Sequence, residues 1–142
     1  MSAFPTIEAT ALDGRAWRLP DDLDRTSVLI LAFQRWQQSE VDDWIEELGA
    51  LGCPHPIFEI PTIGRRYRWM RSFIDGGMRA GIQDPVVRAR TLTAYTDVRR
   101  VLRALGVQDD QHVVVTKVSA GCAVVLRHQG TYDAEVARRL VA

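Results

Sequence analysis

An uninterrupted apolar run constrains the fold more than any other part of this sequence. Residues 27–33 read SVLILAF, with no polar side chain after the serine. A strand with one wet face would alternate apolar and polar residues, so this run predicts a central strand that is covered on both faces. Such strands are typical of α/β domains, in which helices pack on a partly parallel sheet.

An amphipathic helix is expected directly after this strand. Ser39 is a suitable N-cap, and acidic residues fill the first turn, where the helix dipole favours them. Glycine and proline at 49–54 end the pattern. The apolar residues recur at helical spacing and are expected to face the core: Val41, Trp44, Ile45 and Leu48.

The rest of the chain alternates between strand-like and helix-like segments. Two short extended runs flank Asp13-Gly14 and predict an N-terminal hairpin. Pro61 is expected to stop the strand at 57–60. Gly76-Gly77 is expected to break the helix at 64–74 and to open a loop, whose backbone could bind an anion beside Arg79. The 142 residues are expected to form one domain, 1–142. Further strands are expected at 57–60, 90–95, 113–118 and 123–126, and helices at 64–74, 97–105 (capped by Thr96) and from 130 onward.

Charge is unevenly distributed along a chain whose net charge is zero. Residues 1–63 hold eleven acidic and four basic residues, whereas residues 64–106 hold ten basic and three acidic ones. Asymmetry of this size can mark an interaction surface, and it also allows a homodimer in which the two zones pair. Because the net charge is zero and no nucleic-acid-binding motif occurs, nucleic acid is not an expected partner.

Several other classes of protein are disfavoured by the residues. No stretch approaches the roughly 20 apolar residues that cross a bilayer, and Met1–Ile7 lacks the pattern of a secretory signal, so a cytoplasmic location is expected. The three histidines lie far apart, without metal-ligand spacing, so neither a metal nor another cofactor is expected. The two cysteines, Cys53 and Cys122, form no CxxC; small buried side chains are the expected role for both, and a disulfide between them is the alternative.

The order of elements resembles the thioredoxin-like superfamily, especially its peroxiredoxin and thiol–disulfide branch. The residues that carry the resemblance are the hairpin around LDG at 12–14, LILAFQRW at 29–36, LTAYTD at 92–97 and the closing segment 113–130. The resemblance implies an α/β fold with a central mixed sheet, flanking helices and an N-terminal β-hairpin. A narrower similarity, to mitochondrial ATP-synthase assembly factors of this fold, rests on FQRW at 33–36, Trp44 and the Arg-rich stretch ending at Gly81.

The chain departs from that branch where the chemistry should occur. Thiol enzymes of this kind place Cys-x-x-Cys after a tryptophan, but here Trp36 is followed by QQSE, so that Gln37 and Glu40 stand at the cysteine positions. Disulfide exchange proceeds through a thiolate, which neither side chain can supply. The proline that the family places before the strand at 113 is replaced by Asp110-Gln111-His112. We therefore expect a redox-inactive member of the superfamily.

Two functional hypotheses remain, together with plainer structural interpretations. The first is a non-enzymatic binding or assembly protein that contacts an unknown protein partner or a small anion, and the alternative is a thiol-dependent oxidoreductase or peroxidase that uses Cys53 or Cys122. The arginines interleaved with aromatics at 65–71 suit anionic partners, although they can equally be a solvated helix face. The start of the first helix offers free N–H groups, although Ser39 can simply cap it. The candidate binding residues are Trp36, Gln37, Gln38, Ser39, Glu40, Arg65, Arg68, Arg71 and Arg79.

Overall fold

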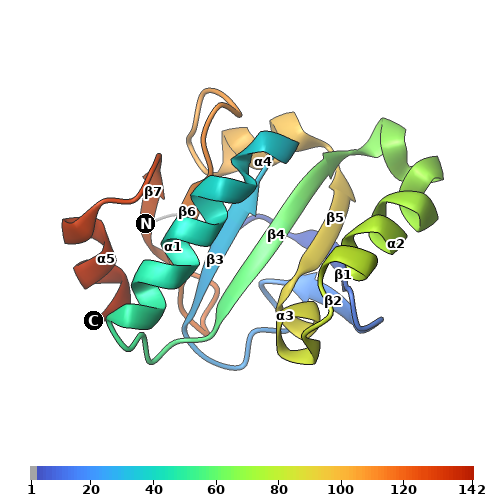
Figure 1. Cartoon of the computed structure of the whole chain (residues 1–142). Helices are drawn as coiled ribbons and strands as arrows, with labels where there is room; N and C mark the ends of the chain where they lie inside the picture. The colour runs from blue at the N-terminus through green and yellow to red at the C-terminus, as the bar shows by residue number, and fades with distance from the viewer. Residues whose placement is uncertain (1–2) are drawn as a thin grey trace.

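A seven-stranded mixed sheet forms the centre of the molecule (Figure 1), as seen in a computed structural model that describes residues 3–142. The strand order is β2-β1-β5-β4-β3-β6-β7. The three inner strands β3, β4 and β5 are parallel, and the strands on either side of them pair in antiparallel fashion. The strands are β1 (Ile7–Ala11), β2 (Ala16–Leu19), β3 (Ser27–Ala32), β4 (Ile57–Gly64), β5 (Leu92–Thr96), β6 (Val114–Val118) and β7 (Val124–Gln129).

Helices cover both faces of this sheet. Helices α1 and α5 pack on one face, and α4 packs on the other. Helix α2 lies on the same side as α1, toward the hairpin end of the sheet (Figure 1). The helices are η1 (Arg35–Gln37), α1 (Gln38–Ala50), η2 (Arg65–Met70), α2 (Arg71–Gly81), α3 (Pro85–Arg90), α4 (Val98–Ala104) and α5 (Ala134–Val141), where η marks a 3-10 helix.

The apolar run that the sequence singles out is the central strand β3. Its side chains alternate between two buried clusters, with Val28 and Ile30 beneath α1 and α5, and Leu29 and Leu31 beneath α4. The prediction of a strand covered on both faces is confirmed. The N-terminal hairpin is confirmed as well, because β1 and β2 pair in antiparallel register around Asp13-Gly14.

Trp44 fixes α1 to the sheet. Its ring is fully buried and packs edge-on against Tyr132 and His128, at centroid distances of 5.2 and 5.6 Å. Its indole N–H donates to the Gly130 carbonyl over 3.0 Å, which joins α1 to the loop before α5. Ile45, also expected in the core, is instead 37% exposed, because it lies one residue further around the helix.

The second parallel strand runs longer than the sequence indicates. Pro61 does not stop it, and β4 continues to Gly64. The pairing of β4 with β3 ends at Pro61, and its pairing with β5 begins at Thr62. The missing N–H of the proline therefore falls where the strand changes its partner, which is where a proline disturbs the ladder least.

The glycine pair does not break the next helix. Gly76 and Gly77 lie inside α2, which continues to Gly81, so the predicted loop and its anion cradle beside Arg79 are wrong. Glycine inside a helix costs about 1 kcal/mol relative to alanine. The buried Asp75, which accepts hydrogen bonds from β5, holds this part of α2 on the sheet despite that cost.

Several helix starts differ by one or a few residues from the prediction. Ser39 is not the N-cap of α1, because the 3-10 turn of η1 leads into the helix and Ser39 is exposed in its first turn. Asp97 rather than Thr96 caps α4, with its carboxylate accepting from the N–H of Arg100. The last helix begins only at Ala134, capped by Asp133. A carboxylate is a stronger acceptor than a hydroxyl for the free N–H groups of a helix end.

The described residues contain no helix that combines the length and apolar character needed to span a membrane. The segment Met1–Ile7 is described only from residue 3, so Met1 and Ser2 lie outside the described residues.

The packing of α1 leads to a stability prediction. Truncating Trp44 to alanine should lower the free energy of unfolding by about 3–5 kcal/mol, because it leaves a cavity under the helix and an unpaired carbonyl. Chemical denaturation followed by far-UV circular dichroism measures this change. The matched control is Ile45→Ala on the exposed side of the same helix, and equal losses for both variants would contradict the assigned packing.

Candidate functional site

The start of α1 is held by the buried side chain of Gln37. Its Oε1 accepts from the backbone N–H groups of Phe33 (2.8 Å) and Gln34 (3.3 Å), which follow β3. Its Nε2 donates to the backbone carbonyl of Asp110, 2.6 Å away in the loop before β6. Gln34 adds a parallel link, donating from Nε2 to the Asp110 carboxylate over 2.8 Å. One amide therefore joins two segments that lie 73 residues apart.

Glu40 repeats this arrangement one turn along the helix. Its carboxylate is buried, and Oε1 accepts from the backbone N–H of Val113 at 3.2 Å. The same oxygen lies 3.3 Å from Nδ1 of the half-exposed His112. The loop that precedes β6 is thus held to the helix by side chains at both of the positions where thiol enzymes carry cysteine.

The remaining predicted residues at this helix start face the solvent. Trp36 is 55% exposed, and Gln38 and Ser39 are exposed as well. Gln37 and Glu40 therefore do not lie beside them on an open edge, and their polar atoms are used inside the protein. The binding role predicted for Trp36, Gln38 and Ser39 stays a prediction.

Neither cysteine lies at this helix start in the chain. Cys53 follows the opposite end of α1, where its sulfur is 3.6 Å from the carbonyl oxygen of His55. Thirteen residues of helix separate it from the start, or about 20 Å at 1.5 Å per residue. Cys122 lies in the turn between β6 and β7, in a left-handed conformation with φ of 70°. Both are half-buried free thiols.

A second carboxylate is buried beneath the first turn of α1. Glu59 of β4 is 6% exposed, and burial raises the pKa of its carboxyl above the usual value. A hydrogen bond from Gln38 opposes this shift, and the negative charge of Asp42 adds to it. Glu59 is thus the group near the helix start whose protonation is disturbed by its surroundings.

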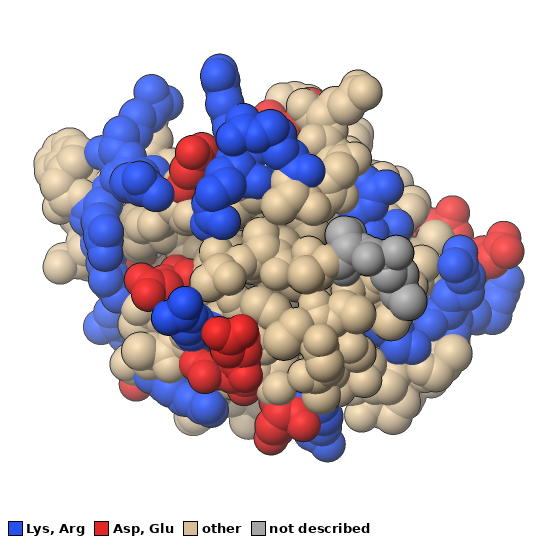
Figure 2. Space-filling view, turned by 180° about the vertical axis from the view of Figure 1, so that it is seen from behind, with Lys and Arg blue, Asp and Glu red and all other residues tan. Residues whose placement is uncertain are grey.

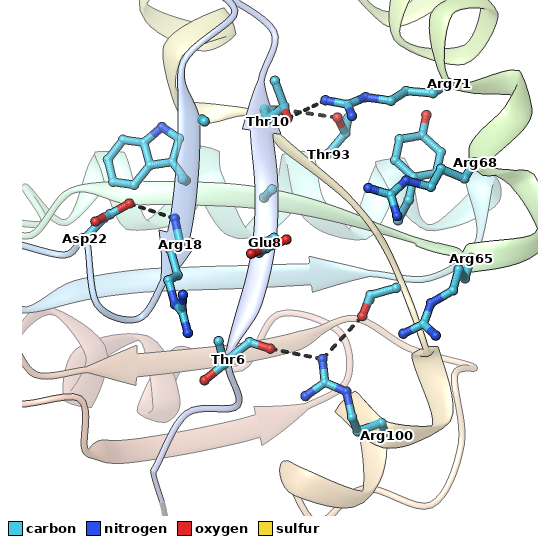
Figure 3. A pocket seen from close by; sticks show the side chains of 15 residues that line it. Thr6, Glu8, Thr10, Arg18, Asp22, Arg65, Arg68, Arg71, Thr93 and Arg100 are labelled. Atoms are coloured by element: carbon cyan, nitrogen blue, oxygen red, sulfur yellow. Dashed lines mark hydrogen bonds between the residues drawn. The ribbon is translucent and has the colours of Figure 1, made fainter.

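A groove lined by arginines lies at the hairpin end of the sheet, with a volume of about 740 Å³. Strands β2, β1 and β5 supply one side, and η2 with the start of α2 supplies the other (Figure 3). We call it the arginine groove. Its lining residues are Thr6, Glu8, Ala9, Thr10, Ala16, Trp17, Arg18, Asp22, Arg65, Arg68, Arg71, Thr93, Tyr95, Thr96 and Arg100.

Two of the groove arginines are anchored within the protein. Arg71 donates to the Thr10 hydroxyl and lies 3.7 Å from the Asp75 carboxylate. Arg100 donates to the Thr6 carbonyl at 2.9 Å and to the Thr96 hydroxyl at 3.3 Å. Such contacts fix the direction of a long side chain before any ligand arrives, which lowers the entropy lost on binding.

Three other arginines keep their charge largely free. Within residues 3–142, Arg65 and Arg68 have neither a hydrogen-bond nor an ion-pair partner for their guanidinium groups. Arg18 forms an exposed ion pair with Asp21 at 3.3 Å, of a kind that contributes little in water. Figure 3 shows Arg65, Arg68 and Arg71 on one side of the groove and Arg18 on the other, with Glu8 between them.

Asp75 of α2 connects residues on both sides of the groove through its buried carboxylate. It is buried, and accepts from the Tyr95 hydroxyl at 2.8 Å and from the Thr93 hydroxyl at 3.3 Å. Burial raises the pKa of Tyr95 well above its usual value, and the bond to Asp75 adds to the shift. Tyr95 is therefore a neutral donor that fixes Asp75, which in turn holds Arg71.

The structure brings together only part of the predicted set. Arg65, Arg68 and Arg71 converge on the arginine groove, while Arg79 lines a neighbouring cavity between α2, α3 and the hairpin turn. Sequence reasoning missed Arg18 and Arg100, which come from distant segments and carry no motif. Figure 2 shows basic side chains gathered at the edge formed by η2 and α2 and above α4 on the face turned away in Figure 1.

Large aromatic side chains protrude beside the groove. Trp69 is 82% and Phe73 79% exposed, one turn apart at the junction of η2 and α2. Tyr67, in the same 3-10 helix as Trp69, is 40% exposed. In the part of the chain that the structure describes, no cluster of three or more potential metal ligands occurs.

Comparison with solved structures identifies the fold. The chain is similar to the exposed lipoprotein thioredoxin Etrx1 from Streptococcus pneumoniae, with a TM-score of 0.62 and 13% identity over 96% of this chain and 98% of that one. It is also similar to BsSco, described as a member of the Sco family of cytochrome c oxidase assembly proteins (TM-score 0.66, 11% identity, 98% and 91% covered). The structure of yeast Sco1 with copper bound is similar as well, with a TM-score of 0.62 and 12% identity over 99% of this chain and 91% of that one.

No protein-family model matches the sequence, and comparison with curated proteins gives no match either. The fold is thioredoxin-like, as the sequence resemblance implied, and the similar structures include thiol–disulfide oxidoreductases and Sco proteins. At 11–13% identity the similarity concerns the fold.

The bonds of Gln37 lead to a prediction with a matched control in the same turn. Gln37→Leu should lower the free energy of unfolding by about 2–4 kcal/mol, because it leaves buried backbone groups without partners. Ser39→Leu introduces the same side chain at an exposed position whose hydroxyl forms no hydrogen bond within residues 3–142, and should change stability by less than about 0.5 kcal/mol. Urea denaturation of both variants measures the difference. Equal effects would show that the start of α1 does not depend on Gln37.

Burial of Glu59 predicts a pH dependence. A carboxyl whose pKa is raised on folding favours the folded state below its usual pKa and disfavours it as the pH rises, because the unfolded chain ionises freely. Glu59→Gln should therefore gain stability relative to the wild type between pH 4 and pH 7. The exposed Glu46→Gln is the control. If the difference in unfolding free energy between Glu59→Gln and the wild type stayed constant from pH 4 to pH 7, the raised pKa of Glu59 would be refuted.

Proposed function

We propose that this chain is a binding protein of thioredoxin-like fold that holds an anionic group in the arginine groove and carries out no thiol–disulfide chemistry. One observation carries the proposal: the guanidinium groups of Arg65 and Arg68 face a groove of about 740 Å³ without any partner in residues 3–142. Free guanidinium groups held around a concave surface suit carboxylates and phosphates, which they can bind in bidentate fashion.

The residues at the start of α1 support the second part of the proposal, that the chain carries out no thiol–disulfide chemistry. A reactive thiol needs the electropositive environment of a helix start, and that place is taken by Gln37 and Glu40, whose polar atoms are bound internally. Cys53 and Cys122 lie elsewhere in the chain, so neither thiol is placed at the helix start, where the dipole of α1 would favour a thiolate. No observation favours the alternative of a thiol-dependent oxidoreductase over binding.

An assembly role is the form of this function that the surface supports. Trp69 and Phe73 stand almost fully in solvent next to the groove, and buried aromatic and arginine side chains dominate the energetics of protein interfaces. A protein partner that brings an acidic group to the groove would cover both. Trp36, exposed at the start of α1, adds a further aromatic contact on the surface.

The proposal predicts anion binding that depends on the unpaired arginines. Inorganic pyrophosphate or an oligoglutamate peptide should bind the wild type in a 1:1 complex at low salt, measured by isothermal titration calorimetry. The double variant Arg65→Gln, Arg68→Gln should weaken that binding about 10- to 100-fold, because each charge-assisted hydrogen bond contributes about 1.5–3 kcal/mol. In the part of the chain that the structure describes, neither guanidinium has a hydrogen-bond or ion-pair partner, so the variant should remain folded.

The control removes the same charge elsewhere. Arg99→Gln with Arg103→Gln changes α4 outside the groove and should leave the affinity within about twofold, as expected for a weak, screened effect. Equal weakening by both double variants would show unspecific attraction. Disulfide reduction or peroxide consumption that is measurable in the wild type and lost in Cys53→Ser, Cys122→Ser would overturn the non-catalytic part.

A further inference from the structure

The arginine groove has the dimensions of a site for a small molecule. Its volume of about 740 Å³ lies within the range of about 300–1,000 Å³ that is usual for such sites. It has sides from two parts of the chain, the β1–β2 hairpin with β5 and the η2–α2 segment (Figure 3). A ligand in it would be enclosed between these two sides instead of resting on a flat surface.

The chemistry of the groove calls for a compact, highly charged group. Arg65 and Arg68 on one side are joined by Arg71 and Arg100, whose guanidinium groups are held by Thr10 and Thr6. A di- or triphosphate concentrates several negative charges within a few ångströms, whereas carboxylates would have to be gathered from several residues. The planar fork of a guanidinium also matches two oxygens of one phosphate group.

The free edge of the sheet beside the groove is blocked at Arg18 for the addition of a further strand. At β2, the N–H of Arg18 donates to the carboxylate of Asp22 (2.7 Å), and the carbonyl of Arg18 accepts from the N–H of Asp22 (2.8 Å). Both backbone groups that an added strand would need at Arg18 are therefore occupied. Because main-chain hydrogen bonds supply the affinity in strand addition, an acidic peptide cannot gain that affinity at Arg18, and only its carboxylates could contact the groove.

Glu8 sets a second requirement, which is that the ligand must carry hydrogen-bond donors. Its carboxylate is exposed on β1 between Arg18 and the arginines of η2 (Figure 3), and within residues 3–142 it forms no ion pair. A carboxylate only accepts hydrogen bonds, so it repels phosphate and attracts hydroxyl or amine donors. A ligand that suits both features carries phosphates at one end and hydroxyl groups at the other.

We infer that the arginine groove binds an organic di- or triphosphate, with its phosphates on the guanidinium groups of Arg65, Arg68 and Arg100 and its hydroxyl groups on Glu8. This inference rests on the proposed function and specifies its ligand class. Arg71, held by Thr10 and Asp75, adds positive charge on the same side of the groove as Arg65 and Arg68.

The test separates charge attraction from recognition of hydroxyls. Adenosine triphosphate and adenosine diphosphate serve as the organic probes, and inorganic tripolyphosphate as the probe that has charge alone, titrated calorimetrically without metal ions. The wild type should bind at least one organic probe at least as tightly as tripolyphosphate. Arg65→Gln with Arg68→Gln should weaken every phosphate probe at least tenfold.

The decisive variant is Glu8→Gln. It removes the repulsion, so the affinity for tripolyphosphate should rise, while the affinity for the organic probe should rise less or fall, and the ratio of the two should change at least fivefold. The exposed Glu135→Gln on α5 is the control and should change neither. An equal effect of Glu8→Gln on all probes would overturn the inference.

Failure of the inference and failure of the proposed function have different signatures. If oligoglutamate binds through Arg65 and Arg68 while the organic phosphates do not, the ligand class is wrong and anion binding stands. If none of the phosphates and no oligoglutamate binds the wild type at low salt, both are overturned.

Discussion

The two-sided hydrogen bonding of Gln37 is the contact on which the start of α1 depends. The amide is buried, it accepts from the backbone that leaves β3, and it donates to the loop that enters β6. Glu40 makes the equivalent contact to Val113 one turn later. A buried amide or carboxylate must have its partners, since leaving one without them costs about 1–3 kcal/mol. The residues at the two positions where thiol enzymes of this fold carry cysteine therefore join two segments of the fold.

The unpaired arginines of η2 follow from how the charges are distributed. Exposed carboxylates are plentiful on α1, at Asp42, Asp43, Glu46 and Glu47, and none of them forms an ion pair within residues 3–142. Opposite charges on one small domain would normally be free to pair, so their segregation leaves a positive field at the hairpin end of the sheet. An excess of positive charge in a groove raises the local concentration of an anion and speeds its arrival. This is the electrostatic basis for binding there.

The architecture could be predicted from the sequence because it depends on buried apolar pattern. The strand at 27–33 and the hairpin at Asp13-Gly14 both follow from local signals, and both are observed. The errors fall where tertiary contacts override local preference: Gly76-Gly77 stays helical because Asp75 is bound to β5, and the strand continues through Pro61 because it changes partner there.

The candidate site was harder to predict for a related reason. Arg65 and Arg68 stand out because they cluster with aromatics in one segment, whereas Arg100 and Glu8 reach the groove only through the pairing of β1 with β5. No local signal distinguishes those two from any exposed charged residue. Gln37 was identified as the residue at a cysteine position, but its burial depends on the loop at Asp110, 73 residues away. A sequence pattern shows which groups are available, and the topology decides which of them meet.

That topology also relates the arginine groove to the start of α1. Ligands of sheets with parallel strands bind beyond the carboxyl ends of those strands. Strand β3 leads there into Gln37, strand β4 into Arg65, and strand β5 into the segment that carries Arg100. Because β1 is antiparallel to β5, Glu8 begins its strand at this same edge. The closed helix start and the arginine groove are therefore neighbouring parts of one edge, and the groove uses the loops after β4 and β5 in place of the loop after β3.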